Sequence, residues 1–224
     1  MFSRHDLVWL SARGWERACA AAPPASRAAI AGWGAAGWPA VVTRRPAGLA
    51  PGQVALGIAL PPRLDGSKPR IGVKADAGDI VRTGAAMRLS DAIPAAPGTW
   101  RTALALLDDE AGRAGLALRV YGSLAFQALT GQPYVSATSD IDLLLHPATP
   151  AEYHQALALL GRHAQALPLD GELVFAGGHA VAWKELAACP HGQARVLAKS
   201  LHGVSLVAID ALLAASNEDA PCTT

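Results

Sequence analysis

The stretch from Tyr121 to Leu145 constrains the fold most, because it sets two acidic residues inside an apolar run. Asp140 and Asp142 alternate with Ile141 and Leu143, which is the pattern of a half-buried β-strand. Residues two apart on a strand face the same side, so the two carboxylates should lie next to each other. Adjacent like charges are unfavourable unless cations neutralise them. Oxygen ligands at this spacing suit Mg²⁺, and we predict Asp140 and Asp142 as its ligands.

The dipeptide Gly122-Ser123 precedes these carboxylates by one predicted helix and one predicted strand. Glycine allows the backbone to approach a ligand closely, and the free N–H groups at a helix start favour a phosphate. The hydroxyl of Ser123 can donate one more hydrogen bond. We therefore predict Gly122 and Ser123 as substrate-binding residues that hold a phosphate group.

The chain is expected to form two domains, separated by a segment of prolines and glycine at residues 91–99. We expect residues 1–92 to form a small α+β domain that binds substrate or partner. We expect residues 98–216 to form a domain of helices packed on a mixed sheet, and residues 217–224 to form a frayed tail. The fold class expected for the whole chain is α+β.

The individual elements follow from apolar periodicity and from turn residues. The expected strands are residues 40–43, 53–60, 70–75, 117–121, 139–145, 167–175, 180–186 and 195–199. The expected helices are residues 26–35 and 100–113, capped by Ser26 and Thr99, and residues 124–129, 150–164 and 206–214. The strands over 167–175 and 180–186 are expected to form a hairpin.

Composition excludes several classes of protein. The chain is 51% hydrophobic and 17% charged, which is not the composition of a disordered protein. A formal charge of +1 argues against nucleic acid as a partner. No apolar run is long enough to span a membrane, and no export signal is recognisable at the N-terminus. Three scattered cysteines argue against a disulfide framework, so we expect a cytoplasmic protein.

The order strand, Gly-Ser, helix, strand, Asp-x-Asp resembles the nucleotidyltransferase superfamily. That resemblance implies a nucleotidyltransferase-like sheet in the C-terminal domain and a third catalytic carboxylate on a later strand. Asp170 and Glu172 are the candidates. We favour Asp170 because it lies nearer the strand start and precedes Gly171, with Glu172 as the alternative. The 17 positions from Ser123 to Asp140 exceed the usual spacing, which predicts an extra loop.

The chain is also similar to the phosphoribosyl-dephospho-CoA transferases of the malonate decarboxylase system, which are holo-acyl-carrier-protein synthases. The matching segments are residues 4–10, 37–45, 56–61, 121–123, 129–134, 139–144, 170–173 and 180–186. The resemblance implies 2′-(5″-triphosphoribosyl)-3′-dephospho-CoA as donor and a serine of the apo acyl-carrier subunit of malonate decarboxylase as acceptor. It also implies pyrophosphate as the second product and Mg²⁺ as cofactor.

Three basic residues are further candidates for substrate binding. Lys184 lies on the predicted strand 180–186 and could contact the pyrophosphate. Arg44 and Arg45 follow an apolar strand and could bind the phosphates of the donor or an acidic surface of the carrier protein.

Two other functions remain compatible with these residues. One is an ATP-dependent adenylyltransferase acting on a small molecule or a protein, which a comparison of donors would distinguish. The other is a non-catalytic nucleotide-binding module. The joint presence of Gly122, Ser123, Asp140 and Asp142 counts against the second, because a degenerate domain is free to lose any of them.

Overall fold

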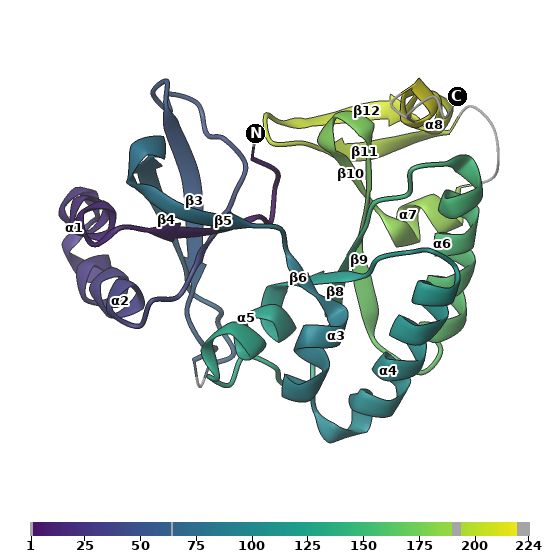
Figure 1. Ribbon diagram of the computed structural model, residues 1–224, viewed down its shortest axis with the longest axis horizontal. Coiled ribbons are helices and arrows are strands. Elements are labelled where there is room, and N and C mark those ends of the chain that lie inside the picture. Colours follow the sequence, from purple (N-terminus) through teal and green to yellow (C-terminus); the bar gives the residue numbers. More distant parts are fainter. Residues whose placement is uncertain (1, 64, 190–193, 219–224) are drawn as a thin grey trace. The chain divides into compact units, whose positions relative to one another are not determined.

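The computed structural model describes residues 2–63, 65–189 and 194–218 (Figure 1). The chain divides into two compact units, Met1–Ala86 with Leu201–Gly203, and Met87–Ser200 with Val204–Thr224. The division falls before the segment 91–99 at which we expected it. The reason is that residues 87–88 form a strand that pairs within the second unit.

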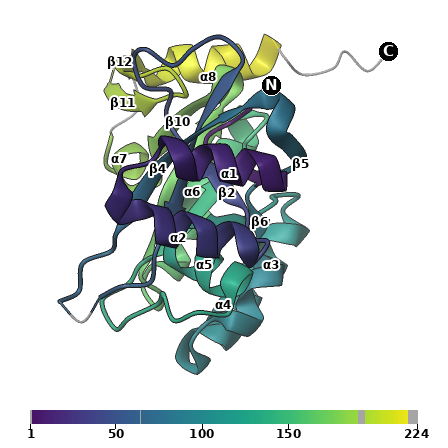
Figure 2. The same ribbon diagram turned by 90° about the vertical axis from the view of Figure 1, so that its left-hand side faces the viewer.

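The first unit is an antiparallel sheet with two long helices. Its elements are β1 (Leu7–Leu10), α1 (Ala12–Ala21), α2 (Pro24–Ala35), β2 (Ala40–Val42), β3 (Gln53–Ala59), β4 (Arg70–Asp76), the short 3-10 helix η1 (Ala77–Asp79) and β5 (Ile80–Gly84). The strand order is β4-β3-β2-β1-β5. Both helices lie on one face of this sheet (Figure 2), where Trp15, Ile30 and Trp33 are buried.

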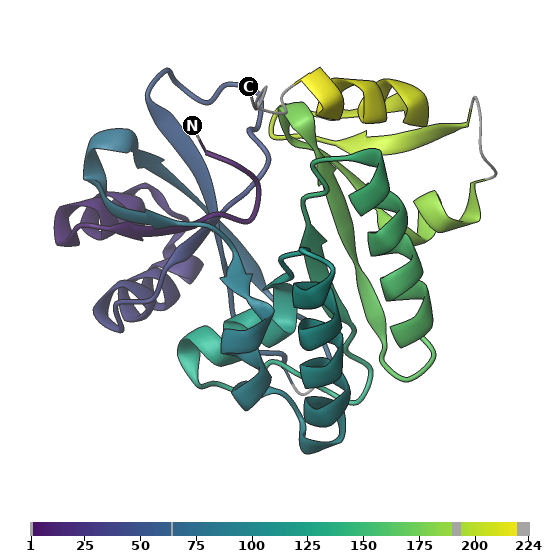
Figure 3. The same ribbon diagram turned by 45° about the vertical axis from the view of Figure 1, so that its right-hand side comes forward.

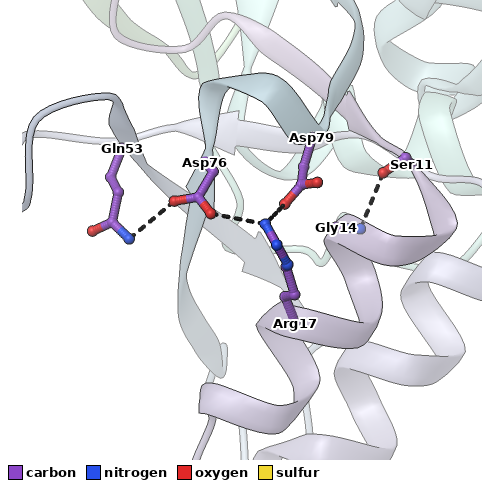
Figure 4. A network of polar contacts seen from close by, with 6 residues as sticks. All are labelled: Ser11, Gly14, Arg17, Gln53, Asp76 and Asp79. Atoms are coloured by element: carbon purple, nitrogen blue, oxygen red, sulfur yellow. Dashed lines mark hydrogen bonds and ion pairs between the residues drawn. The ribbon is translucent and has the colours of Figure 1, made fainter.

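Polar contacts attach α1 to the sheet (Figure 4). The guanidinium of Arg17 donates to the carboxylates of Asp76 and Asp79 at 3.0 and 3.1 Å. The hydroxyl of Ser11 accepts from the Gly14 N–H and caps the helix. The two charge-assisted contacts thus hold α1 against the end of β4 and the following η1, and the Ser11 cap satisfies the first turn of the helix.

The second unit is a seven-stranded mixed sheet covered by helices, as the sequence predicted. Its elements are β6 (Met87–Arg88), α3 (Leu89–Ala92), η2 (Ile93–Ala95), α4 (Gly98–Arg113), β7 (Arg119–Tyr121), α5 (Gly122–Thr130), β8 (Ile141–Leu145), α6 (Pro150–His163), β9 (Leu169–Phe175), η3 (Ala176–Gly178), β10 (His179–Ala182), α7 (Trp183–Ala188), β11 (Arg195–Lys199), β12 (Val204–Ala208) and α8 (Ile209–Glu218). The strand order is β12-β11-β10-β9-β8-β7-β6, with β8 and β9 parallel.

The core of the second unit lies between one face of the sheet and the helices. Helices α4 and α6 are side by side (Figure 3). Leu107 of α4 and Leu160 of α6 belong to the same buried cluster as Leu143 of β8 and Leu173 of β9. Because side chains alternate along a strand, Asp142 and Asp170 project from the opposite face.

The sequence-based prediction of the C-terminal elements was wrong in two places. The strand expected over 180–186 ends at Ala182, because Trp183 and Leu186 are buried at helical spacing and begin α7. Leu206 belongs to β12, which pairs with β11, and the last helix begins only at Ile209.

The helix starts also differ from expectation. Pro24 begins α2 and Gly98 begins α4, each preceded by a proline, so Ser26 and Thr99 are not caps. The tail expected at 217–224 lies outside the described residues from 219 onwards, and α8 extends to Glu218. Among the described residues, no helix combines the length and apolar character needed to cross a bilayer.

Candidate active site

Three carboxylates meet at the start of the two parallel strands. Asp142 of β8 and Asp170 of β9 are register partners, and Asp140 immediately precedes β8. One oxygen from each side chain lies within 4.8 Å of the others. The pair predicted from the sequence is therefore joined by Asp170. Glu172, the alternative third carboxylate, is not a member of this cluster.

Gly171 allows the two strands to approach at this point. Its φ is +131°, a conformation that side chains other than glycine rarely adopt. A Cβ atom there would lie 2.0 Å from the carbonyl oxygen of Leu143. Any other residue would push β9 away from β8, and with it Asp170 away from Asp142.

Glu172 has a different role in the sheet. It is buried, 3% exposed, and its Oε1 accepts a hydrogen bond from the Lys199 Nζ at 3.0 Å. Lys199 is on β11, so this ion pair reaches across β10. Burial of a charge requires such a partner, which accounts for the acidic residue in a buried strand.

Gly122 lies directly against the carboxylate cluster. Its φ is +68°, and a Cβ atom would come within 2.0 Å of Asp142 Oδ2. The carboxylate thus occupies the space that any other side chain would need. Ser123 follows as the second residue of α5 and is half-buried. The predicted phosphate-holding turn and the predicted metal ligands are therefore neighbours in space.

Lys184 also reaches the cluster, although from a helix and not from the strand we expected. It is the second residue of α7, and its Nζ lies 3.6 Å from Asp170 Oδ1. The two side chains are 58% and 40% exposed. An exposed pair of this kind contributes little to stability, so Lys184 remains free to move towards an anionic ligand.

Arg44 and Arg45 belong to the first unit. The Arg45 guanidinium donates to the carbonyl oxygens of Leu49 and Ala50 at 2.9 and 3.3 Å. These contacts brace the loop after β2. Arg44 is exposed.

The loop expected before Asp140 is ordered by Gln127, a residue that the sequence analysis did not single out. Its Oε1 accepts from the backbone N–H groups of Tyr134 and Val135 at 3.0 and 2.9 Å. Tyr134 also stacks on Phe126, with ring centroids 5.6 Å apart. Burial raises the pKa of Tyr134 to about 12, so its hydroxyl stays protonated. A polar residue inside a short apolar helix, as Gln127 is, was the available signal.

Comparison with known proteins matches both units. The model of the phosphoribosyl-dephospho-CoA transferase MdcG N-terminal domain covers residues 3–86, and that of the MdcG C-terminal domain covers residues 88–210. This chain belongs to the phosphoribosyl-dephospho-CoA transferase family. The residues of the carboxylate cluster all lie in the C-terminal match, and the two matches meet where the structure divides.

Individual members of the family align along most of the chain. A phosphoribosyl-dephospho-CoA transferase of Xanthomonas campestris pv. campestris is 44% identical over 189 residues, which is 84% of this chain and 86% of the relative. The Bradyrhizobium diazoefficiens protein of that name is 36% identical over 208 residues, 91% of this chain and 89% of the relative. No solved structure was found to match. Membership of this family makes the chain a transferase.

Proposed function

We propose that this protein transfers the phosphoribosyl-dephospho-CoA group from 2′-(5″-triphosphoribosyl)-3′-dephospho-CoA to a serine of the apo acyl-carrier subunit of malonate decarboxylase. Pyrophosphate is the second product. The observation that carries the proposal is the meeting of Asp140, Asp142 and Asp170 beside Gly122, in a chain that belongs to the transferase family.

The second unit is proposed to be a nucleotidyltransferase-like domain. The order β7, Gly-Ser turn, α5, β8 and the parallel pairing of β8 with β9 support this assignment.

The cluster fits a divalent cation. Three carboxylates with oxygens this close repel one another without a positive partner, and an all-oxygen ligand set suits Mg²⁺. Asp140, Asp142 and Asp170 would hold the ion, which would neutralise charge on the phosphates and lower the pKa of a bound hydroxyl. Cys19 and Cys189 are free thiols, in agreement with the cytoplasm as the compartment we propose.

The residues around the cluster are proposed to bind the phosphates, stabilise the leaving group and accept the serine proton. In the reaction, the serine Oγ forms a bond to the α-phosphorus while the bond from that phosphorus to the pyrophosphate oxygen breaks. The Gly122 turn and the Ser123 hydroxyl bind phosphate oxygens and orient the triphosphate. The cationic Lys184 binds the leaving pyrophosphate. The serine proton passes to one of the carboxylates or to water.

The intact mass of the apo acyl-carrier subunit tests this function. After incubation with the donor, Mg²⁺ and this protein, the carrier should gain the mass of one phosphoribosyl-dephospho-CoA group. The Asp140→Asn variant should stay folded, because it removes one of several repelling charges, and it should leave the mass unchanged. A mass gain with ATP and none with the CoA derivative would identify an adenylyltransferase instead. No gain with either donor would refute transfer to this carrier.

A further inference from the structure

Charge is distributed unequally between the two units. Residues 1–86 contain eleven Lys and Arg and five Asp and Glu, a formal charge of +6, whereas residues 87–224 contain eight and thirteen, a charge of −5. The total of +1 hides this asymmetry. A basic domain of this size indicates an anionic partner for the first unit.

The five-stranded sheet of the first unit has one face that neither α1 nor α2 covers. Strand alternation and register place Leu7, Trp9, Val41, Ala55, Gly57 and Gly72 on this face, which we call the open face. Leu7 and Ala55 are buried, so the accessible part of the open face lies towards the two edges of the sheet. Val8, Leu56 and Ile58 alternate with these residues and are buried. The middle strands contribute the short side chains of Val41 and Ala55 and the glycine Gly57 to the open face.

Cations flank the open face at both edges of the sheet. Arg70 and Lys74 are on the edge strand β4, in register with Ala59 and Ala55 of β3. Arg82 is on β5, the edge strand at the other side of the sheet. All three side chains are exposed. Arg82 lies 3.5 Å from the ring of Trp9. In the part of the chain that the structure describes, no ion pair is formed by Arg70 or Lys74.

Two carboxylates that follow Lys74 in the sequence share one cationic partner. Asp76 follows Lys74 by two residues on β4, and it binds Arg17 at 3.0 Å and Gln53 at 3.2 Å. Asp79 binds the same arginine. The group keeps a formal charge of −1, but both carboxylates are bound to Arg17, and neither pairs with Lys74 or Arg70.

The width of this arrangement distinguishes between possible ligands. Lys74 and Arg82 are separated by four strand spacings of about 4.8 Å, or about 19 Å in all. A phosphate or a small anion needs donors that converge in a concave site. Cations at opposite edges of one sheet face suit a broad surface of opposite charge.

We propose that the open face, with Arg70, Lys74 and Arg82, docks an acidic surface of the acceptor protein. This inference rests on the proposed function, in which the acceptor is the apo acyl-carrier subunit. The first unit thus determines which protein presents its serine, and the second unit performs the transfer.

Charge reversal at Lys74 tests the docking surface. The Lys74→Glu variant should raise the KM for the apo-carrier about fivefold or more at low salt, with unchanged kcat and unchanged KM for the donor. Arg70→Glu should act in the same direction. The matched control is Arg13→Glu on α1, an exposed residue, which changes the net charge equally and should behave as the wild type.

Carrier binding is measured in parallel by calorimetry without donor, so that docking is assessed independently of transfer. A fivefold weaker binding by Lys74→Glu, with Arg13→Glu unaffected, supports the proposal. Equal effects of Lys74→Glu and Arg13→Glu, or no effect of either, overturn it. A raised KM for the donor alone would assign the face to phosphate binding and also overturn it. Loss of transfer by the wild type with carrier binding retained would instead refute the proposed function.

Discussion

At the scale of single residues, the site depends on positions where a side chain is excluded. Gly122 leaves room for the Asp142 carboxylate, and Gly171 leaves room for the backbone of Leu143. Both glycines have φ values in the left-handed region. The carboxylates therefore owe their proximity as much to two missing Cβ atoms as to the acidic residues themselves.

The Gly122→Ala variant should lose transfer activity and about 1–3 kcal/mol of unfolding free energy. The stability loss follows from the left-handed backbone and the contact with Asp142. Gly131→Ala is the matched control, because Gly131 has φ +70° and open space around it. It should be destabilised by the left-handed backbone alone and keep its activity. Steady-state rates and urea unfolding of both variants measure this difference, and equal activities would contradict it.

Removing the charge of Asp170 should chiefly reduce the rate of transfer, whereas removing the charge of Glu172 should chiefly reduce the stability of the fold. Asp170→Asn should reduce transfer about a hundredfold or more without loss of stability, because it removes one of three mutually repelling charges. Glu172→Gln should cost about 1–3 kcal/mol of unfolding free energy, since it weakens a charged hydrogen bond with Lys199. Its activity per folded molecule should change less. Single-turnover rates and thermal unfolding test this assignment, and the reverse order of activities would move the catalytic role to Glu172.

At the scale of elements, the parallel pairing of β8 and β9 brings the carboxylates of the candidate site together. Their register sets Asp142 opposite Asp170, while Leu143 and Leu173 face the helices. Helices α4 and α6 cover that apolar side and are joined by polar contacts. Glu110 of α4 accepts from Arg162 and His163 of α6 at 3.1 and 3.2 Å.

This helix contact predicts a pH dependence of stability. Hydrogen bonds first from Arg162 and then from His163 lower the pKa of Glu110 below its ordinary value of 4.5. The ionised form is thus favoured by folding, so the contribution is complete above that value and is lost as the pH falls through the lower folded pKa. The melting temperature of Glu110→Gln should be below that of the wild type near neutral pH, and the difference should shrink towards pH 3.

A control for this prediction lies on the same helix. Asp109 pairs with Arg113 on the exposed surface, so Asp109→Asn removes a carboxylate without touching α6. It should change the melting temperature little at any pH. A difference between wild type and Glu110→Gln that stays constant down to pH 3 would show that the Glu110 charge does not stabilise the contact.

At the scale of the whole molecule, our proposals place catalysis and partner binding in separate units. The carboxylates and Lys184 belong to the second unit, and Lys74 belongs to the first. Lys74 and Lys184 share no partner among the described contacts. Independent sites contribute additively to free energies.

The effects of Lys74→Glu and Lys184→Ala on kcat/KM for the carrier should therefore multiply in the double variant. Lys74→Glu is expected to act on KM, and Lys184→Ala chiefly on kcat. Steady-state kinetics of the wild type, both single variants and the double variant measure the product. If the double variant were no slower than the slower single variant, the two lysines would act on one site, and the division of roles between the units would be wrong.

Local sequence patterns were sufficient for much of the fold and for the centre of the site. Alternation over 139–145 predicted a strand with Asp140 and Asp142 on its polar face; the observed β8 spans Ile141–Leu145, and Asp140 precedes it. The strand β11 was predicted at its full extent, 195–199. The helix expected over 124–129 is present as α5, Gly122–Thr130, and it ends at Gly131, which has φ +70°. Patterns of this kind follow from backbone geometry and apolar burial, which act over a few residues.

Long-range contacts decided the rest. The choice of Asp170 over Glu172 depends on which strand lies beside β8 and in which register, and Lys199 becomes the partner of Glu172 only when β11 joins the sheet. Burial of Trp183 turned an expected strand into α7. The sequence by itself determined the residue types, the periodicity of apolar residues along each strand and helix, and the resemblance to a transferase family. The tertiary structure decided which carboxylates meet, because strand register and close backbone approach are set by packing between segments distant in the chain.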